Sequence, residues 1–260
     1  MFRNGSRLLA SCVLASVILS GSHTVFASGD IDVSYRYWKP TFSAKVGPAE
    51  SGGVTVPWVD AKSQLGVASR SINDLRLSWQ LTENSKVQID SFSTSLHGTG
   101  TPNFKMGSWD LSVGKFKTDV DFKDLQVSWV KYTNEYAGGD IRHGYTLGLR
   151  NVRINAVSNQ IDGTEHFTKD FNIIFPTVGL VFETNRESRI SGFASLSGAY
   201  AGSKGHFYDA ELGGKSFIDD QKSLSVTAGY RILKIKANKD NGDKLDTRIN
   251  GPFFGVEKNF

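Results

Sequence analysis

Apolar and polar residues alternate along most of the chain after its first 28 residues. In residues 74–81, DLRLSWQL, Leu75, Leu77, Trp79 and Leu81 fall on one side of an extended backbone, and polar residues fall on the other. A period of two residues is typical of a β-strand with one apolar and one polar face. No helical period of useful length competes with it, so the pattern predicts an all-β fold. The same alternation recurs at 31–37, 125–129, 145–149, 190–200 and 224–232.

Turn signals divide these stretches into strands. Short polar connections at 82–86, 134–140, 184–188 and 219–222 alternate with Gly-, Ser- and Lys-rich ones at 40–72, 97–119, 155–169, 201–205 and 236–246. All of the second set are long except the tight 201–205. Short turns at one end and longer loops at the other are typical of outer-membrane barrels. The count predicts a single antiparallel up-and-down transmembrane β-barrel of about ten strands, with eight or twelve as alternatives. The expected strands are 30–39, 73–81, 87–96, 120–132, 141–152, 170–183, 189–200, 206–218, 223–235 and 248–260.

The final residues, GPFFGVEKNF, continue the alternation to the end of the chain, with Phe254, Val256 and Phe260 on the face expected to meet lipid. A terminal Phe that closes an alternating strand resembles the assembly signal of bacterial outer-membrane β-barrel proteins. The resemblance implies that periplasmic chaperones and the barrel-assembly machinery are partners that read these three residues. Lys258 departs from it, because the family usually has an apolar or aromatic residue there. So near the membrane interface, its stem could reach back along the apolar surface.

Prolines and aromatic residues refine the expected ends of the barrel. Pro176 and Pro252 interrupt predicted strands, and proline is poorly placed in a sheet without an edge, so these two residues leave open where the sixth and last strands end. Aromatic residues near the short turns are expected to form a girdle at the periplasmic interface. They are Trp79, Trp129, Phe182, Phe217 and Phe260.

The first 27 residues follow the plan of a secretory signal peptide. Arg3 and Arg7 precede an apolar stretch, and a small-residue pattern ends at Ala27, after which cleavage is expected. We prefer this to a lipoprotein signal around Cys12, because the apolar stretch continues beyond that cysteine. The mature domain would be 28–260, without cysteine and therefore without a disulfide or cysteine nucleophile.

The net charge and the length of the apolar runs exclude further classes of protein. Cleavage lowers Lys+Arg from 30 to 28 against 26 Asp+Glu, which leaves a formal charge of +2 and argues against nucleic acid as a partner. The mature part has no apolar run near the roughly 18–20 residues that a spanning helix needs. The expected location is the bacterial outer membrane. A soluble periplasmic β-sandwich would also alternate, but it would not need the terminal Phe or turns of unequal length at the two ends.

Charged residues occupy the phase of the strands that would face the lumen. One interpretation makes them a constriction that selects permeants, with Arg36, Arg76, Asp90, Arg150, Arg189 and Arg231 as the candidates. The other, which we favour, is that a narrow barrel fills its interior and pairs its charges. The remaining charged residues of this phase are Asp32, Asp74, Asp124, Glu183, Asp209 and Glu211.

Candidate catalytic and metal-binding residues are few. His97, His166 and His206 fall near the outer loops, but no Ser or carboxylate stands at a spacing that resembles the enzymatic barrel families. The segment DNGD at 240–243 with Asp246 lacks the remaining ligands of a calcium loop. The sequence therefore predicts no catalytic residue, metal or cofactor.

Lysine and arginine in the outer loops could contact outer-membrane lipids, and in particular the phosphates of lipopolysaccharide. Simple solubility is the alternative explanation. These residues are Lys45, Lys62, Arg70, Lys105, Lys115, Lys117, Lys169, Lys204, Lys236, Lys239 and Lys244.

The expected function is passive. A small porin-like channel is the first hypothesis, and a closed structural or adhesive surface barrel is the alternative. An outer-membrane enzyme that acts on lipid or peptide ranks third.

Overall fold

The computed structural model describes residues 30–47, 58–102, 105–106, 109–110, 114–136, 141–184, 188–200, 202–238 and 243–260. The expected signal peptide lies outside this range, so cleavage after Ala27 stays a prediction. No helix in the described part is long and apolar enough to cross a membrane.

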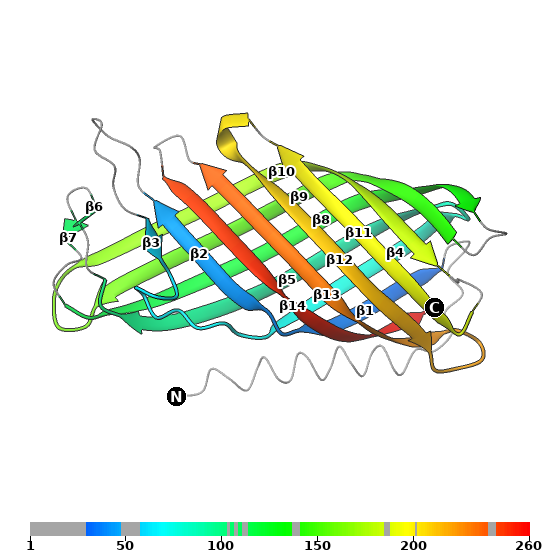
Figure 1. The fold of residues 1–260 in the computed structure, drawn as a ribbon, viewed down its shortest axis with the longest axis horizontal. Helices are drawn as coiled ribbons and strands as arrows, with labels where there is room; N and C mark the ends of the chain where they lie inside the picture. Colours follow the sequence, from blue (N-terminus) through cyan, green and yellow to red (C-terminus); the bar gives the residue numbers. More distant parts are fainter. Residues whose placement is uncertain are drawn as a thin grey trace.

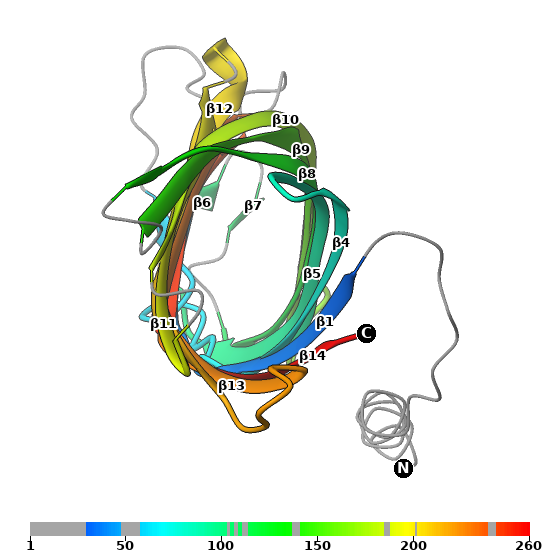
Figure 2. The same ribbon diagram turned by 90° about the vertical axis from the view of Figure 1, so that its right-hand side faces the viewer.

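Ten strands form a closed antiparallel barrel, as the alternation predicts. Each strand pairs with the next, and β1 closes the ring by pairing with β14, from Asp32 opposite Asn259 to Trp38 opposite Phe253. Figure 1 shows the strands inclined to the long axis, and Figure 2 shows them along that axis as one ring. The strands are β1 (Ile31–Trp38), β4 (Ile72–Thr82), β5 (Ser85–Gly100), β8 (Phe116–Tyr136), β9 (Ile141–Gln160), β10 (His166–Thr184), β11 (Ile190–Tyr200), β12 (Gly205–Phe217), β13 (Leu224–Asn238) and β14 (Lys244–Asn259).

The strands extend further from the short turns than the sequence predicts. The expected loops 155–169 and 236–246 shrink to 161–165 and 239–243, because β9, β10, β13 and β14 continue into them. The expected loop 40–72 contains two further strands, β2 (Thr41–Gly47), which pairs with the first part of β14, and β3 (Val59–Asp60), which pairs with β2. A separate small hairpin joins β6 (Lys105–Met106) and β7 (Trp109–Asp110), and a single turn of 3-10 helix, η2 (Gly202–Lys204), joins β11 to β12.

Each long strand reverses its polarity partway along. Near the short turns, Asp124 of β8 is buried inside the barrel while the adjacent Leu125 is exposed outside. One step further from those turns, Phe122 is buried inside and Lys123 is exposed outside. The barrel is therefore apolar outside and polar inside at the short-turn end, and the opposite at the other end, which we call the outer end.

An apolar core fills the outer end of the barrel. It combines inward side chains of most strands with Val59, Ala61, Leu65 and Val67 from the connection between β2 and β4. That connection packs closely against the backbone of β5 at Gly98. A Cβ on Gly98 would lie 2.4 Å from the backbone nitrogen of Val67, so only glycine allows this approach. Each fully buried aliphatic or aromatic side chain contributes about 1.5–3 kcal/mol, so this core is a major source of stability.

Pro176 and Pro252 each lie where their strand pairs with a neighbouring strand on one side but not in regular register on the other. Pro252 lies at the point where β14 changes partner from β1 to β2, and its carbonyl accepts a hydrogen bond from the Lys39 nitrogen at 2.9 Å. Pro176 lies beyond Val178, the last β10 residue that pairs with β11 among the described residues. A missing N–H is tolerated at such edges, so neither proline breaks the barrel.

Candidate functional site

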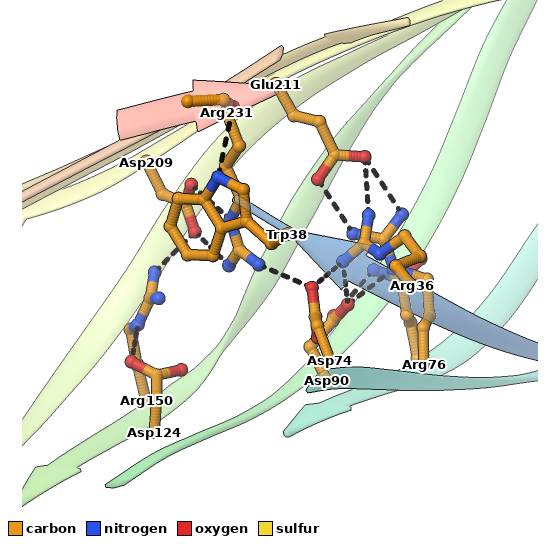
Figure 3. Close-up of polar contacts among 12 residues, drawn as sticks. Arg36, Trp38, Asp74, Arg76, Asp90, Asp124, Arg150, Asp209, Glu211 and Arg231 are labelled. Atoms are coloured by element: carbon orange, nitrogen blue, oxygen red, sulfur yellow. Dashed lines mark hydrogen bonds and ion pairs between the residues drawn. The ribbon is translucent and has the colours of Figure 1, made fainter. Parts of the chain in front are cut away.

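A network of four arginines and five carboxylates crosses the barrel where the polarity reverses (Figure 3). Strand register brings its first pairs together, because Arg36 lies opposite Asp74, Arg76 opposite Asp90, and Glu211 opposite Arg231. The alternating pattern alone directs all of these side chains inward. The network therefore combines pairs that face each other on adjacent strands with contacts between strands that are not neighbours in the sheet.

Arg36 and Arg76 form one side of the network. Arg36 is ion-paired with Asp74 and donates to Glu211 at 2.8 Å. Arg76 donates to Asp90 at 2.5 Å and to Glu211 at 3.2 Å. These contacts span the lumen from β1, β4 and β5 on one wall to β12 on the other.

Arg150 and Arg231 form the other side, and Asp209 joins them. Arg150 donates to Asp124 at 2.8 Å and to Asp209 at 2.7 Å. Arg231 donates to Asp209 at 3.0 and 2.7 Å, and to Asp74 at 2.9 Å, which connects the two sides. Hydrogen-bonded pairing of this kind is what allows charge to remain buried.

Aromatic rings cover the network on its outer side. The Arg231 guanidinium lies 5.2 Å from the Trp38 ring and 5.6 Å from the Phe92 ring. The Trp38 indole N–H in turn donates to the Gly251 carbonyl at 3.0 Å. Arg36 and Arg150 each lie 5.1 Å from an aromatic ring, those of Phe253 and Phe207. Cation–π contacts stabilise this boundary between charge and the apolar core.

A polar cavity of about 1200 Å³ occupies the other side of the network. It extends from Arg36 and Arg231 to residues at the short-turn rim such as Glu83 and Asn259. Its walls carry nearly equal numbers of acidic and basic side chains, so the cavity has little net charge.

A second charged cluster lines this cavity near the short turns. The Tyr132 hydroxyl donates to Glu183 at 2.5 Å, and Arg142 donates to the same carboxylate at 2.8 Å while its guanidinium stacks 3.6 Å from the Tyr132 ring. Lys86 approaches Glu183 to 3.6 Å. The sequence analysis identified only Glu183 of these four. Tyr132, Arg142 and Lys86 could have been identified because they occupy alternate positions of their strands that face the lumen.

Five of the six expected lumen residues belong to the network: Arg36, Arg76, Asp90, Arg150 and Arg231. Arg189 does not. It is exposed at the short-turn rim, and it donates to the carbonyls of Phe217 and Ile218, each at 3.3 Å. Arg189 lies just before β11 begins, so its side chain is not directed into the lumen by the alternation of that strand.

The expected assembly residues lie on the outer face of β14 and at its end. Phe254 is 62% exposed, Val256 39% and Phe260 47%. The expected aromatic girdle is partly present. Trp79 and Phe182 are exposed on the outside, and Trp129 stacks edge-on against Tyr145. Phe217 is an exception, because it faces the cavity beside Lys215.

The outer histidines lie away from the cavity. His97 contacts Asp119 at 2.5 Å on the outside of β5 and β8, and the neighbouring Ser95 donates to Asp121 at 2.5 Å. Within the described ranges, no group of three or more His, Cys, Asp or Glu side chains is placed to hold a metal ion. Asp243 of the DNGD segment instead accepts a hydrogen bond from Lys169 at 2.7 Å, and 240–242 lie outside the described residues.

A closed antiparallel barrel of ten inclined strands, with a polar interior inside an apolar belt, is the fold of bacterial outer-membrane β-barrel proteins. The outer-membrane protease OmpT from Escherichia coli is similar in structure, with a TM-score of 0.62 and 10% identity over 92% of this chain and 99% of that one. At this identity the similarity concerns the fold alone.

Other outer-membrane proteins are similar to a lesser degree. OprG from Pseudomonas aeruginosa gives a TM-score of 0.39 with 13% identity over 90% of this chain and 96% of that one. Ail from Yersinia pestis gives 0.36 with 12% identity over 90% and 99%. TM-scores below 0.5 do not establish a shared arrangement of strands. No protein family and no curated protein matches the sequence.

Proposed function

We propose that this protein is an integral outer-membrane barrel with a closed lumen, which serves as a structural or adhesive surface protein. The observation that carries the proposal is the sequence of layers inside the barrel. The arginine–carboxylate network, the aromatic rings above it and the apolar core follow one another toward the outer end. An apolar core that fills the outer end of the barrel opposes the passage of water and ions.

The reversal of polarity supports a position in the membrane. Apolar side chains such as Leu149 (58% exposed), Ile174 (63%) and Phe254 (62%) surround the short-turn half, where they would meet lipid. Beyond them the same strands are polar outside and apolar inside, as in a water-soluble β-protein. The outer ends of β8, β9 and β10 would therefore stand in water, where they present a rigid surface to other molecules.

A small passive channel is the second candidate, and the polar cavity favours it. The cavity would supply the periplasmic half of a water path, and opening would require the Arg150–Asp209–Arg231 connection to separate. In that case the network arginines and Asp90 would be the residues that determine selectivity.

Conductance distinguishes these two candidates. Protein refolded from Ser28 onward, verified as a barrel by heat-modifiable gel migration, is recorded in planar bilayers. We expect no discrete steps. Reproducible steps from a verified barrel would reject the closed lumen and support the channel.

An enzyme is the third candidate, since OmpT is a protease and the His97–Asp119 contact could support acid–base chemistry. We expect no turnover of peptide or lipid. Turnover that His97→Ala abolishes, while the barrel still forms, would instead establish an enzyme.

The residues of the terminal strand support assembly factors as partners of this protein. The exposed row of Phe254, Val256 and Phe260 supports recognition by periplasmic chaperones and the barrel-assembly machinery. Removal of Phe260 is expected to lower the yield in the outer membrane more than it lowers refolding in detergent. Equal yields of the shortened and full chains would contradict this.

A further inference from the structure

Two pairs of like-charged side chains face outward at the level where the barrel reverses its polarity. Lys123 of β8 lies directly opposite Arg153 of β9, and Lys234 of β13 lies directly opposite Arg248 of β14. Like charges directly opposite each other in a sheet are destabilising. Their presence at this level therefore calls for a compensating anion.

The chain itself supplies no carboxylate partner to these cations among the described residues. Within the described part of the chain, the one side-chain hydrogen bond of Arg153 goes to the Asn151 amide oxygen, at 3.2 Å. Across the neighbouring strands, the four cations face Ser93, Asn172, Tyr208 and Ser43, all of them uncharged.

The nearest acidic residues along the same faces, Asp121, Asp170 and Asp246, form no ion pair with these cations among the described residues. Asp121 accepts a hydrogen bond from Ser95 at 2.5 Å, and Asp246 is paired with Lys236 at 3.4 Å. The cation Lys169 is likewise paired, with Asp243 at 2.7 Å. Lys169 and Lys236 are thus ion-paired, whereas Lys123, Arg153, Lys234 and Arg248 form no ion pair within the described ranges.

The two pairs lie at the same height on opposite walls. The strand order places five steps between the β8–β9 pair and the β13–β14 pair in a ring of ten. Arg150 and Arg231 are joined inside the barrel by Asp209, which fixes them at one level. Arg153 and Lys234 each follow three residues later on strands that run in the same direction, so both rise by about 10 Å along the strand.

The residues just below the pairs belong to the apolar belt. Leu125, Leu149 and Ile174 are exposed beneath Lys123 and Arg153. Beneath Lys234 and Arg248, Tyr230 is 44% exposed and its hydroxyl accepts a hydrogen bond from Asn250 at 2.8 Å. Tyrosine with an apolar ring and a bonded hydroxyl is enriched at the headgroup level of membranes.

We infer that Lys123–Arg153 and Lys234–Arg248 are two binding sites for phosphate groups of the anionic glycolipid in the outer leaflet. This inference rests on the proposed position of the barrel in the outer membrane. An arginine can hold a phosphate through two parallel hydrogen bonds, and a lysine adds a point charge beside it. A phosphate between the paired cations converts their repulsion into attraction and fixes the height of the barrel in the membrane.

The lysines and arginines expected from the sequence to contact lipid lie in the predicted loops, and none of these four residues is among them. All four lie inside strands of the barrel, and only the register shows that they meet in pairs.

The test compares phosphorylated lipid A with lipid A from which the phosphates have been removed, each in phosphatidylethanolamine vesicles with a chelator present to remove divalent cations. The readout is the unfolding midpoint, measured by heat-modifiable gel migration. We expect phosphorylated lipid A to raise the midpoint of the unchanged protein. The variant with Lys123→Gln, Arg153→Gln, Lys234→Gln and Arg248→Gln should lose at least half of that rise.

A matched control removes the same charge elsewhere at the outer end, with Lys45→Gln, Lys115→Gln, Lys117→Gln and Lys204→Gln. The control should keep the rise. A second readout is the sign of a single change: Lys123→Gln should raise the midpoint in phosphate-free vesicles, where it relieves repulsion, and lower it with phosphorylated lipid A. A purely structural lysine would not reverse its sign in this way.

Equal rises in the fourfold variant and its control, or no rise in the unchanged protein, would overturn the inference. Failure of the barrel to insert into either vesicle would show instead as the absence of the heat-resistant gel band. That outcome would reject the membrane position and overturn the inference with it. The two failures are therefore distinguishable.

Discussion

At the scale of single residues, the network shows how a buried charge depends on its partners. Arg150 is completely buried and is the only ion-pair partner of Asp124 among the described residues, whereas Asp209 also has Arg231. The penalty for burying an ion is several kcal/mol, and it is offset only while the partner is present. Single substitutions in the network should therefore cost more than the loss of one contact.

We expect Arg150→Met to destabilise the barrel by about 3–5 kcal/mol, because it leaves Asp124 buried without a counter-charge. The double change Arg150→Met with Asp124→Leu should recover part of that loss. Urea unfolding of the refolded barrel measures both. As a control, Arg189→Gln, which removes an exposed arginine bonded to two carbonyls, should cost about 1 kcal/mol or less. Equal losses for Arg150→Met and Arg189→Gln would contradict a stabilising network.

The sequence predicts which residues point inward but not which of them meet. Strand alternation identifies Arg36, Arg76, Arg150 and Arg231 as lumen residues, because the phase of a strand is local information. The contacts of Arg231 with Asp74 and of Arg36 with Glu211 cross the barrel, and they depend on its diameter and on the side chains that fill it. Arg189 was predicted in the lumen from phase alone, although it lies just before its strand begins.

At the scale of elements, the β12–β13 turn is organised by one carboxylate. Asp219 accepts hydrogen bonds from the Ser223 hydroxyl at 2.6 Å, from the Leu224 nitrogen at 2.8 Å and from the Ser223 nitrogen at 3.1 Å. These bonds lower the pKa of Asp219 from an ordinary value of 3.8 to about 2. Since the charged form is the one that is bonded, its stabilisation of the turn is present above about pH 4 and is lost as the pH falls through about 2.

NMR titration of the Asp219 carboxyl carbon should therefore give a midpoint near 2. In a Ser223→Ala variant the midpoint should move upward toward 3.8, because the largest of the stabilising hydrogen bonds is absent. A midpoint near 3.8 in the unchanged protein would show that the turn is not held by this carboxylate.

Two adjacent glycines in β12 test how closely the strand packs against its neighbours. A Cβ on the inward Gly213 would lie 2.5 Å from the Phe193 ring, whereas the nearest atom to a Cβ on the outward Gly214 is 3.7 Å away. We expect Gly213→Ala to cost about 1–3 kcal/mol through overpacking. Gly214→Ala should be neutral or gain up to about 1 kcal/mol, because alanine restricts the unfolded chain. Unfolding midpoints that fall equally for both would show that Phe193 does not pack over Gly213.

The outer parts of the strands were missed for a physical reason. The sequence shows ten strands because the short-turn half of each has an apolar face interrupted by polar turns. Beyond the reversal, the apolar residues change to the other face and charged residues occupy the outside, as at Lys123 and Arg153. Such stretches resemble loops in composition, so β9 and β10 were predicted to be about eight and five residues shorter than they are. The strand β2, which pairs with the first part of β14, was missed entirely, because the whole of 40–72 was predicted to be one loop.

At the scale of the whole molecule, the barrel combines two solvent environments along one set of strands. The short-turn half suits a surrounding lipid and a polar interior, and the outer half suits surrounding water and an apolar interior. A single cylinder with both halves has a fixed height in the membrane, because a shift in either direction would place charged residues in lipid or apolar residues in water. In the proposed membrane position, the layer of cations at Lys123, Arg153, Lys234 and Arg248 would coincide with the lipid headgroups.

Cysteine labelling measures that height directly. Asp121 and Val127 lie on the outside of the same strand, β8, six residues apart, on either side of the reversal, and both are exposed. In vesicles, Asp121→Cys should react with a membrane-impermeant thiol reagent, whereas Val127→Cys should be protected at least tenfold. The protein that begins at Ser28 has no other cysteine, so each signal comes from one position. After unfolding in urea both variants should react at the same rate, which controls for intrinsic reactivity. Rapid labelling of Val127→Cys in the folded, membrane-inserted barrel would show that the apolar half of β8 is not in lipid.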